Sequence, residues 1–121
     1  MQKDLLLELQ ETGVKFNKEE IVFIARDMTG QLVWLETGTL QAGLKHILAK
    51  HLKDFMTAFQ LEEKDIPLFL ESIVTYGKVI SNLPSKNANG FDRIYEYKGN
   101  YYMFAGIGDN GFIVTAFPIG K

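Results

Sequence analysis

The sequence contains no cysteine, and it has only three prolines and two histidines among its 121 residues. The absence of cysteine excludes disulfide bonds, thiolate zinc sites and a cysteine nucleophile, so stability must come from packing and any chemistry from other side chains. The longest apolar run near the start is residues 5–7, which Glu8 interrupts, and it is too short for a signal peptide or a membrane span. We therefore expect a cytoplasmic protein without a membrane partner.

The sequence also has no large excess of positive or negative charge, since its net charge is −2. This balance argues against a general nucleic-acid coat protein. The cations are nevertheless concentrated in two segments. Residues 37–53 hold three lysines and no acid, and residues 78–98 hold four cations against two acids. If these segments meet in the fold, they would form a local anion-binding face.

The length is that of one domain with one hydrophobic core. No internal repeat, low-complexity tract or linker divides the chain, so residues 1–121 are predicted to form a single domain.

The first third of the chain predicts a short helix and a hairpin. Apolar residues in the first dozen positions recur at helical spacing. Residues 21–25 and 32–35 are rich in β-branched and aromatic side chains, and the turn-forming residues 27–30 separate them. Trp34, in the second run, is expected to anchor the core.

The middle third predicts two helices. Apolar residues in segment 40–59 are spaced three and four apart, which predicts one long helix with Thr39 as its N-cap. A second helix should follow Asp65, carry Pro67 in its first turn and end at Gly77. This helix is expected to bury Leu70, Ile73 and Val74.

The last third changes to the pattern of strands. A strand should begin at residues 78–80, and three further β-rich runs follow at 91–97, 101–107 and 112–117, with turns at 98–100 and 109–111. The predicted fold class is α+β, with an N-terminal β-hairpin and two helices packed on a C-terminal antiparallel four-stranded sheet.

Both histidines, His46 and His51, lie in the predicted long helix beside Lys45, Lys50 and Lys53. Two groups that titrate near neutral pH among fixed cations suit acid–base chemistry on a phosphodiester. On an ideal helix of about 100° per residue, His46 shares the polar side with Lys50 and Lys53, and His51 falls within the apolar stripe. Each histidine therefore has two interpretations. His51 is either a satisfied core residue or a catalytic one, and His46 belongs either to a solvated basic face or to an active site.

A shared metal is not expected between these two side chains. His46 and His51 are five positions apart, about 140° around a helix, unlike the i, i+4 pairs that bind zinc on one face. Calcium-loop, P-loop and dinucleotide-binding patterns are absent from the sequence. We therefore expect chemistry that requires neither a metal nor a nucleotide cofactor.

Three segments together carry a family resemblance. Residues 33–36 lead into residues 43–51, which contain the spacing Gly-Leu-x-His-Ile-x-x-Lys-His; Arg-Ile-Tyr follows at 93–95, and Gly-Phe-Ile-Val-Thr-Ala-Phe-Pro at 111–118. This set resembles the phage-associated nuclease domains grouped with the barnase, EndoU, colicin and RelE-like (BECR) ribonucleases. The matching core covers roughly residues 33–118. The resemblance implies two helices followed by a four-stranded antiparallel sheet, in agreement with the pattern above.

The function implied by the resemblance is that of a metal-independent endoribonuclease, a toxin-like nuclease encoded by a phage or mobile element. Members of the family typically use the 2′-hydroxyl of RNA as the nucleophile. The implied partners are RNA, either single-stranded or tRNA, and a cognate inhibitor protein. Such a protein would act in the cytoplasm or be delivered to another cell.

The resemblance also implies roles for individual residues. His46 and His51 would be base and acid in either order, Lys50 and Arg93 would stabilise phosphate charge, and Thr115 with Tyr95 would orient the scissile group. Lys50 departs from the family pattern, which more often has arginine, and a lysine lacks the bidentate fork.

Glu36 offers an alternative base, as a carboxylate does in barnase-like members. Glu36, Lys45, Lys53 and Tyr95 are the expected substrate-binding residues.

Simpler interpretations stay open for several of these residues. Arg93 fits a surface cross-strand ion pair, Thr115 fits an ordinary strand residue, and residues 86–90 fit a solvated polar loop. Tyr95 belongs to a group of tyrosines that suits either core packing or base stacking. The alternative functions are a non-catalytic RNA- or protein-binding module of a phage, or a structural domain in phage assembly.

Overall fold

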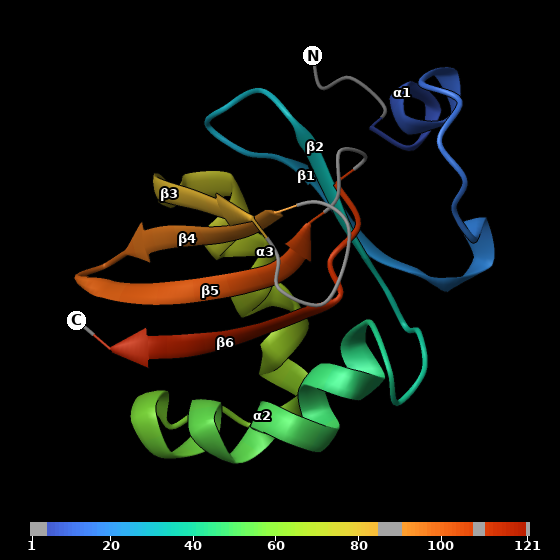
Figure 1. Ribbon diagram of the computed structural model, residues 1–121. Helices are drawn as coiled ribbons and strands as arrows, with labels where there is room; N and C mark the ends of the chain where they lie inside the picture. The colour runs from blue at the N-terminus through green and yellow to red at the C-terminus, as the bar shows by residue number, and fades with distance from the viewer. Residues whose placement is uncertain (1–4, 85–90, 108–110, 121) are drawn as a thin grey trace.

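The computed structural model describes residues 5–84, 91–107 and 111–120, and it has the predicted α+β class (Figure 1). The helices and strands, in chain order, are α1 (Leu5–Glu11), β1 (Ile21–Arg26), β2 (Leu32–Glu36), α2 (Leu44–Phe59), α3 (Ile66–Tyr76), β3 (Lys78–Pro84), β4 (Phe91–Tyr97), β5 (Asn100–Ile107) and β6 (Thr115–Gly120). Two short 3₁₀ turns, η1 (Lys18–Glu20) and η2 (Glu63–Asp65), precede β1 and α3.

Two antiparallel sheets organise these elements. β1 pairs with β2 in a hairpin, and β3, β4, β5 and β6 form a four-stranded meander in sequential order. In Figure 1, α3 crosses one face of the meander and α2 runs alongside β6. The predicted segments at 86–90 and 109–110 lie outside the described residues.

The hairpin is buried on both faces. Phe23 and Leu35 point into the main core, whereas Leu32 and Trp34 belong to a second, smaller cluster that α1 covers. Successive residues of a strand face opposite sides, so a continuous apolar run suits a strand that is covered on both. Trp34 is fully buried, which confirms its predicted role as a core anchor.

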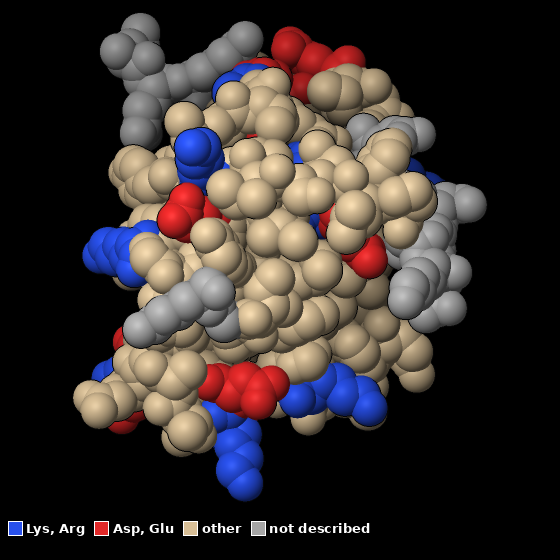
Figure 2. Space-filling view, turned by 60° about the vertical axis from the view of Figure 1, so that its left-hand side comes forward, with Lys and Arg blue, Asp and Glu red and all other residues tan. Residues whose placement is uncertain are grey.

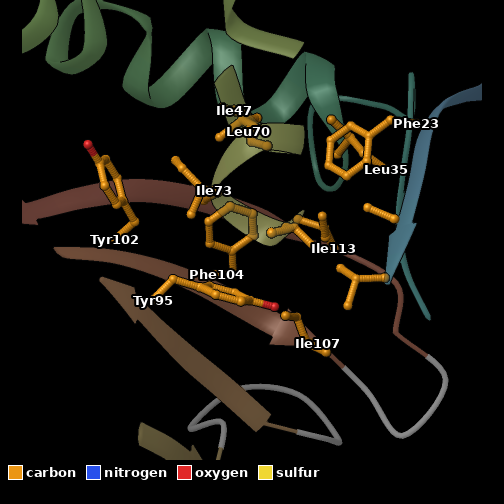
Figure 3. Close-up of a cluster of buried hydrophobic side chains, with 14 of the residues drawn as sticks. Phe23, Leu35, Ile47, Leu70, Ile73, Tyr95, Tyr102, Phe104, Ile107 and Ile113 are labelled. Atoms are coloured by element: carbon orange, nitrogen blue, oxygen red, sulfur yellow. The ribbon is translucent and has the colours of Figure 1, made fainter. Parts of the chain in front are cut away.

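The main core lies between the helices and the meander. The close-up in Figure 3 places Tyr95 and Phe104 on the sheet side, with Ile47 and Leu70 approaching from the helices. The rings of Tyr95 and Phe104 meet edge to face at 5.0 Å between centroids, a favoured aromatic geometry. The predicted burial of Leu70, Ile73 and Val74 on α3 is confirmed.

The long helix begins later than predicted. α2 starts at Leu44, and its N-cap is Gly43 rather than Thr39. Residues 39–43 instead form a turn, in which the Thr39 amide donates to the Ala42 carbonyl at 2.8 Å. Gly43 has a φ of +95°, and a Cβ there would crowd the Glu36 carbonyl. Backbone constraint by this glycine therefore overrides the apolar spacing that included Leu40.

The last strand also begins later than predicted, at Thr115 instead of Phe112. The segment before it pairs with β2: the Trp34 amide donates to the Gly111 carbonyl, and the Ile113 amide donates to the Trp34 carbonyl, both at 3.0 Å. Gly111 has a φ of +96°, and a Cβ at this position would overlap the Leu32 carbonyl. Residues 111–113 thus join the two sheets before the chain enters β6.

A buried ionic network fixes the hairpin turn to the meander. Asp27 Oδ2 accepts hydrogen bonds from Arg93 Nη1 and from the Tyr95 hydroxyl, both at 2.7 Å. Asp27 Oδ1 accepts from the Thr29 amide at 2.9 Å, and Arg93 Nε donates to Asn82 Oδ1 at 2.6 Å. The Asp27 and Arg93 side chains are only 0% and 9% exposed. The predicted surface ion pair of Arg93 is therefore wrong, because its partner comes from the hairpin and the pair is buried.

We predict that Asp27→Asn strongly destabilises the fold, because it leaves the Arg93 guanidinium buried without a counter-charge. Breaking a buried pair on one side costs about 3–5 kcal/mol. Urea unfolding measures the loss, with Glu19→Gln as the control because Glu19 is exposed. A loss no larger than that of the control would contradict a stabilising role for the network.

A second prediction concerns alkaline pH. Burial raises the pKa of Tyr102 from its ordinary value of 10.0 to about 12. Between these values the unfolded chain loses a proton that the folded chain keeps, so the free energy of unfolding falls as pH rises. Urea unfolding at neutral and at high pH should show a smaller decrease for Tyr102→Phe than for the wild type. Tyr76→Phe, at a side chain that is 72% exposed, should keep the wild-type pH dependence.

Candidate functional site

α2 and β6 lie side by side, and their contact brings together several of the predicted site residues. At one end, the Gly43 amide donates to the Val114 carbonyl at 2.8 Å. Further along, the imidazole of His51 stacks on the ring of Phe117, with 4.7 Å between centroids and an interplanar angle of 25°. Thr115 lies between these two contacts in the chain. We call this line, formed by residues 43–58 and 114–118, the α2–β6 seam.

His51 forms a dyad with Asp54. Its Nδ1 lies 3.0 Å from Asp54 Oδ2. A carboxylate can only accept, so Nδ1 carries the hydrogen and Nε2 is left with its lone pair when the ring is neutral. The His51 side chain is 23% exposed, so it is covered on one side by Phe117 and still reaches solvent. The same arrangement orients histidine bases in hydrolytic enzymes.

Asp54 was missed by the sequence analysis. We considered the acid-free segment 37–53, and Asp54 is the next residue. The available signal was the i, i+3 spacing of His51 and Asp54, which places two side chains on adjacent turns of a helix.

His46 lies near the beginning of the seam. Its Nδ1 contacts the Leu40 carbonyl at 2.7 Å, and because a carbonyl only accepts, this nitrogen must carry the hydrogen. The Nε2 of a neutral His46 is therefore also a free acceptor. Leu40 belongs to the turn that precedes α2, so the late helix start is what provides this contact.

Thr115 has a side-chain hydroxyl without a hydrogen-bond partner among the described residues, and its Oγ1 is buried. Thr115 and Phe117 are two positions apart on β6, and alternate residues of a strand share a face. Ala116, between them, is buried in the main core opposite Phe104, so Thr115 and Phe117 share the face of β6 that is turned away from that core. A buried hydroxyl without a partner is costly unless a ligand or water satisfies it.

Lys45, Lys50 and Lys53 are exposed along α2. In the space-filling view of Figure 2, positive and negative side chains both appear along the lower edge, where α2 lies, and the area above them is largely uncharged. The cations of the second basic segment do not gather there in the described part of the chain. Arg93 is committed to Asp27, and Lys98 lies over the Tyr97 ring.

Three predicted site residues lie away from the seam. Arg93 and Tyr95 belong to β4, which β5 separates from β6, and both side chains are bound to Asp27. The carboxylate of Glu36 accepts from the Trp34 indole at 3.0 Å and from the Asn17 amide at 2.9 Å. Along the seam, His51 contacts β6 through Phe117, and Lys50 and Thr115 lie on the same two elements. Arg93, Tyr95 and Glu36 are held in other interactions.

Within the described ranges, no group of three or more histidine, aspartate or glutamate side chains is arranged to hold a metal ion. Among the helices that the structure describes, none combines the length and the apolar character needed to cross a membrane.

Comparison with known proteins found no matching family model and no matching curated protein.

The geometry of the dyad leads to a spectroscopic prediction. Asp54→Ala should release the His51 ring from its fixed Nδ1–H tautomer, so that the neutral ring populates both tautomers. Ring ¹⁵N NMR shifts of the neutral imidazole measure this population. His46 is an internal control, because its Nδ1 is held by Leu40 and not by Asp54. Unchanged ¹⁵N shifts of His51 would contradict the dyad.

Proposed function

We propose that the protein is a metal-independent endoribonuclease whose active site lies along the α2–β6 seam. One observation supports this above the others: a histidine oriented by a carboxylate shares the seam with a buried, unpartnered threonine hydroxyl. The resemblance of residues 43–51 and 111–118 to the BECR ribonucleases supports the same assignment, since residues 43–51 and 114–118 belong to the seam.

The proposed reaction uses the 2′-hydroxyl of the RNA as the nucleophile. His51 Nε2 takes the proton of this hydroxyl, the 2′-oxygen forms a bond to phosphorus, and the bond from phosphorus to the 5′-oxygen breaks. The leaving 5′-oxygen gains a proton, and a 2′,3′-cyclic phosphate remains. Asp54 keeps His51 in the reactive tautomer and stabilises the imidazolium that forms, as in other carboxylate–histidine pairs.

The remaining seam residues suit the other requirements of this reaction. The Thr115 hydroxyl can donate to a non-bridging phosphate oxygen, and the exposed Lys50 supplies a positive charge one residue before His51. The leaving oxygen takes its proton either from solvent or from Nε2 of a protonated His46, which lies about 140° around α2 from His51. Arg93 has no part in this proposal, because its charge is neutralised by Asp27.

The test is cleavage of single-stranded RNA in EDTA, with detection of the cyclic phosphate. His51→Ala should lower the rate by about 10²–10⁴-fold, the usual contribution of a general base. Thr115→Val keeps the side-chain shape and should lower the rate by about 10²–10³-fold, the effect of losing one donor to a transition-state oxygen. His46→Ala determines whether His46 or solvent protonates the 5′-oxygen.

Thr75→Val on α3 is the matched control, and it should cleave at the wild-type rate. RNA with 2′-O-methyl groups should resist cleavage, because it lacks the nucleophile. Equal product from the wild type and from His51→Ala would overturn the proposed active site.

A second candidate function is that of a non-catalytic module that binds RNA or another protein. The observation in its favour is the buried pairing of Arg93 and Tyr95 with Asp27, which removes two of the expected catalytic groups. Binding of RNA that weakens steeply with salt, without any product, would select this function.

A further inference from the structure

A groove opens beside the His51–Asp54 dyad, between the second half of α2 and the adjacent ends of β5 and β6. Its volume is about 650 Å³, and its lining residues are Lys53, Asp54, Thr57, Ala58, Phe59, Asn100 and Pro118. This size is typical of sites for small organic ligands, which fall at about 300–1,000 Å³.

The groove adjoins the dyad through its helix wall, because Asp54 both lines the groove and holds His51. On the sheet wall, Pro118 lines the groove, and Phe117, on which the His51 ring stacks, points to the opposite face of β6. A group bound in the groove would therefore lie next to a phosphate held at His51.

The lining has the chemistry of a nucleoside site. Ala58, Phe59 and Pro118 provide an apolar wall for the face of a base, and the Asn100 carboxamide can meet the polar edge of a base. Asn100 Nδ2 contacts the Lys98 carbonyl at 3.4 Å, which leaves Oδ1 available as an acceptor. Lys53 places a positive charge at the groove, where the phosphate that accompanies a nucleoside needs one.

We propose that this groove binds the nucleoside next to the scissile phosphate, and that Asn100 determines which base is accepted. The proposal rests on the proposed ribonuclease function, because it assigns the groove to the same substrate. An aliphatic ligand would use the apolar wall alone and would leave Lys53 and Asn100 without partners, so a nucleotide fits the lining better.

The first experiment measures binding of the four ribonucleoside 3′-monophosphates by NMR titration, with ribose 5-phosphate and inorganic phosphate as probes that lack a base. At least one nucleotide should bind about tenfold more tightly than ribose 5-phosphate, the effect of one base-stacking contact. Equal affinities for all probes would overturn the nucleoside site.

A matched pair of variants locates the binding. Ala58→Phe fills the groove, and Ala49→Phe adds the same ring elsewhere; both alanines are exposed on α2. They are nine positions apart, which is about 180° around the helix. Ala58→Phe should weaken nucleotide binding about tenfold and leave phosphate binding unchanged, whereas Ala49→Phe should change neither. Equal weakening by both variants would contradict the location.

Asn100→Leu tests specificity separately, because it removes the Oδ1 acceptor and keeps a side chain of similar shape. The order of affinities for the four nucleotides should change. An unchanged order would overturn the role of Asn100.

Cleavage assays on the same proteins separate this proposal from the proposed function. RNA cleavage with an unchanged rate and base preference in Ala58→Phe would overturn the groove and leave the nuclease intact. Nucleotide binding at the groove without RNA cleavage would overturn the nuclease and leave the binding site intact.

Discussion

The Asp27 carboxylate connects parts of the chain that are distant in sequence. It lies in the turn of the β1–β2 hairpin, and it receives Arg93 and Tyr95 from the middle of the meander. Because both partners are buried, a displaced turn would leave the Arg93 charge without its counter-charge and the Tyr95 hydroxyl without its acceptor. The network therefore specifies one position of the hairpin against the meander. Residues 111–113 pair with β2 just before β6 begins, so the position of the hairpin also determines theirs.

The candidate site depends indirectly on the position of the hairpin against the meander. β2 holds residues 111–113, and these lead directly into β6, which carries Thr115 and Phe117. On the other side of the seam, Gly43 fixes the start of α2, because its amide donates to the Val114 carbonyl and a Cβ at this position would crowd the Glu36 carbonyl. The relative position of His51 and Thr115 is thus set by backbone pairing at one end of the seam, together with ring stacking on Phe117. Arg93, which the sequence suggested as a catalytic residue, contributes to this framework through Asp27.

Much of the fold could be predicted because its signals are local. Pro67 and Gly77 mark the ends of α3, and the aromatic and β-branched runs give the strands of the meander. The two larger errors in element boundaries, at Leu44 and Thr115, follow Gly43 and Gly111. Both glycines have positive φ and lie so close to a carbonyl of β2 that a Cβ would not fit. Such contacts join residues far apart in sequence, so periodicity within a segment carries no trace of them.

The candidate site was predictable in the same partial way. A site between the lysine-rich helix and the last strand was predicted from the motifs around His51 and Thr115, and those motifs lie on α2 and β6, which are in contact. The separation of Arg93 from that seam could not be foreseen, because an arginine on a strand gives no indication of which acid it will meet. Asp27 is 66 positions away from Arg93. Asp54 was accessible from helical spacing, but a count of charges by segment placed it outside the segment considered.

The fluorescence of Trp34 can report on the smaller hydrophobic cluster separately from the main core. It is the protein's single tryptophan, and its indole lies between Phe16 and Phe112, with Nε1 bound to Glu36. Its fluorescence emission therefore reports the environment under α1 and not the larger core between the helices and the meander. Partial unfolding that releases α1 alone would alter the emission while the far-ultraviolet dichroism of the meander persisted, so the two signals together can distinguish a stepwise from a concerted transition.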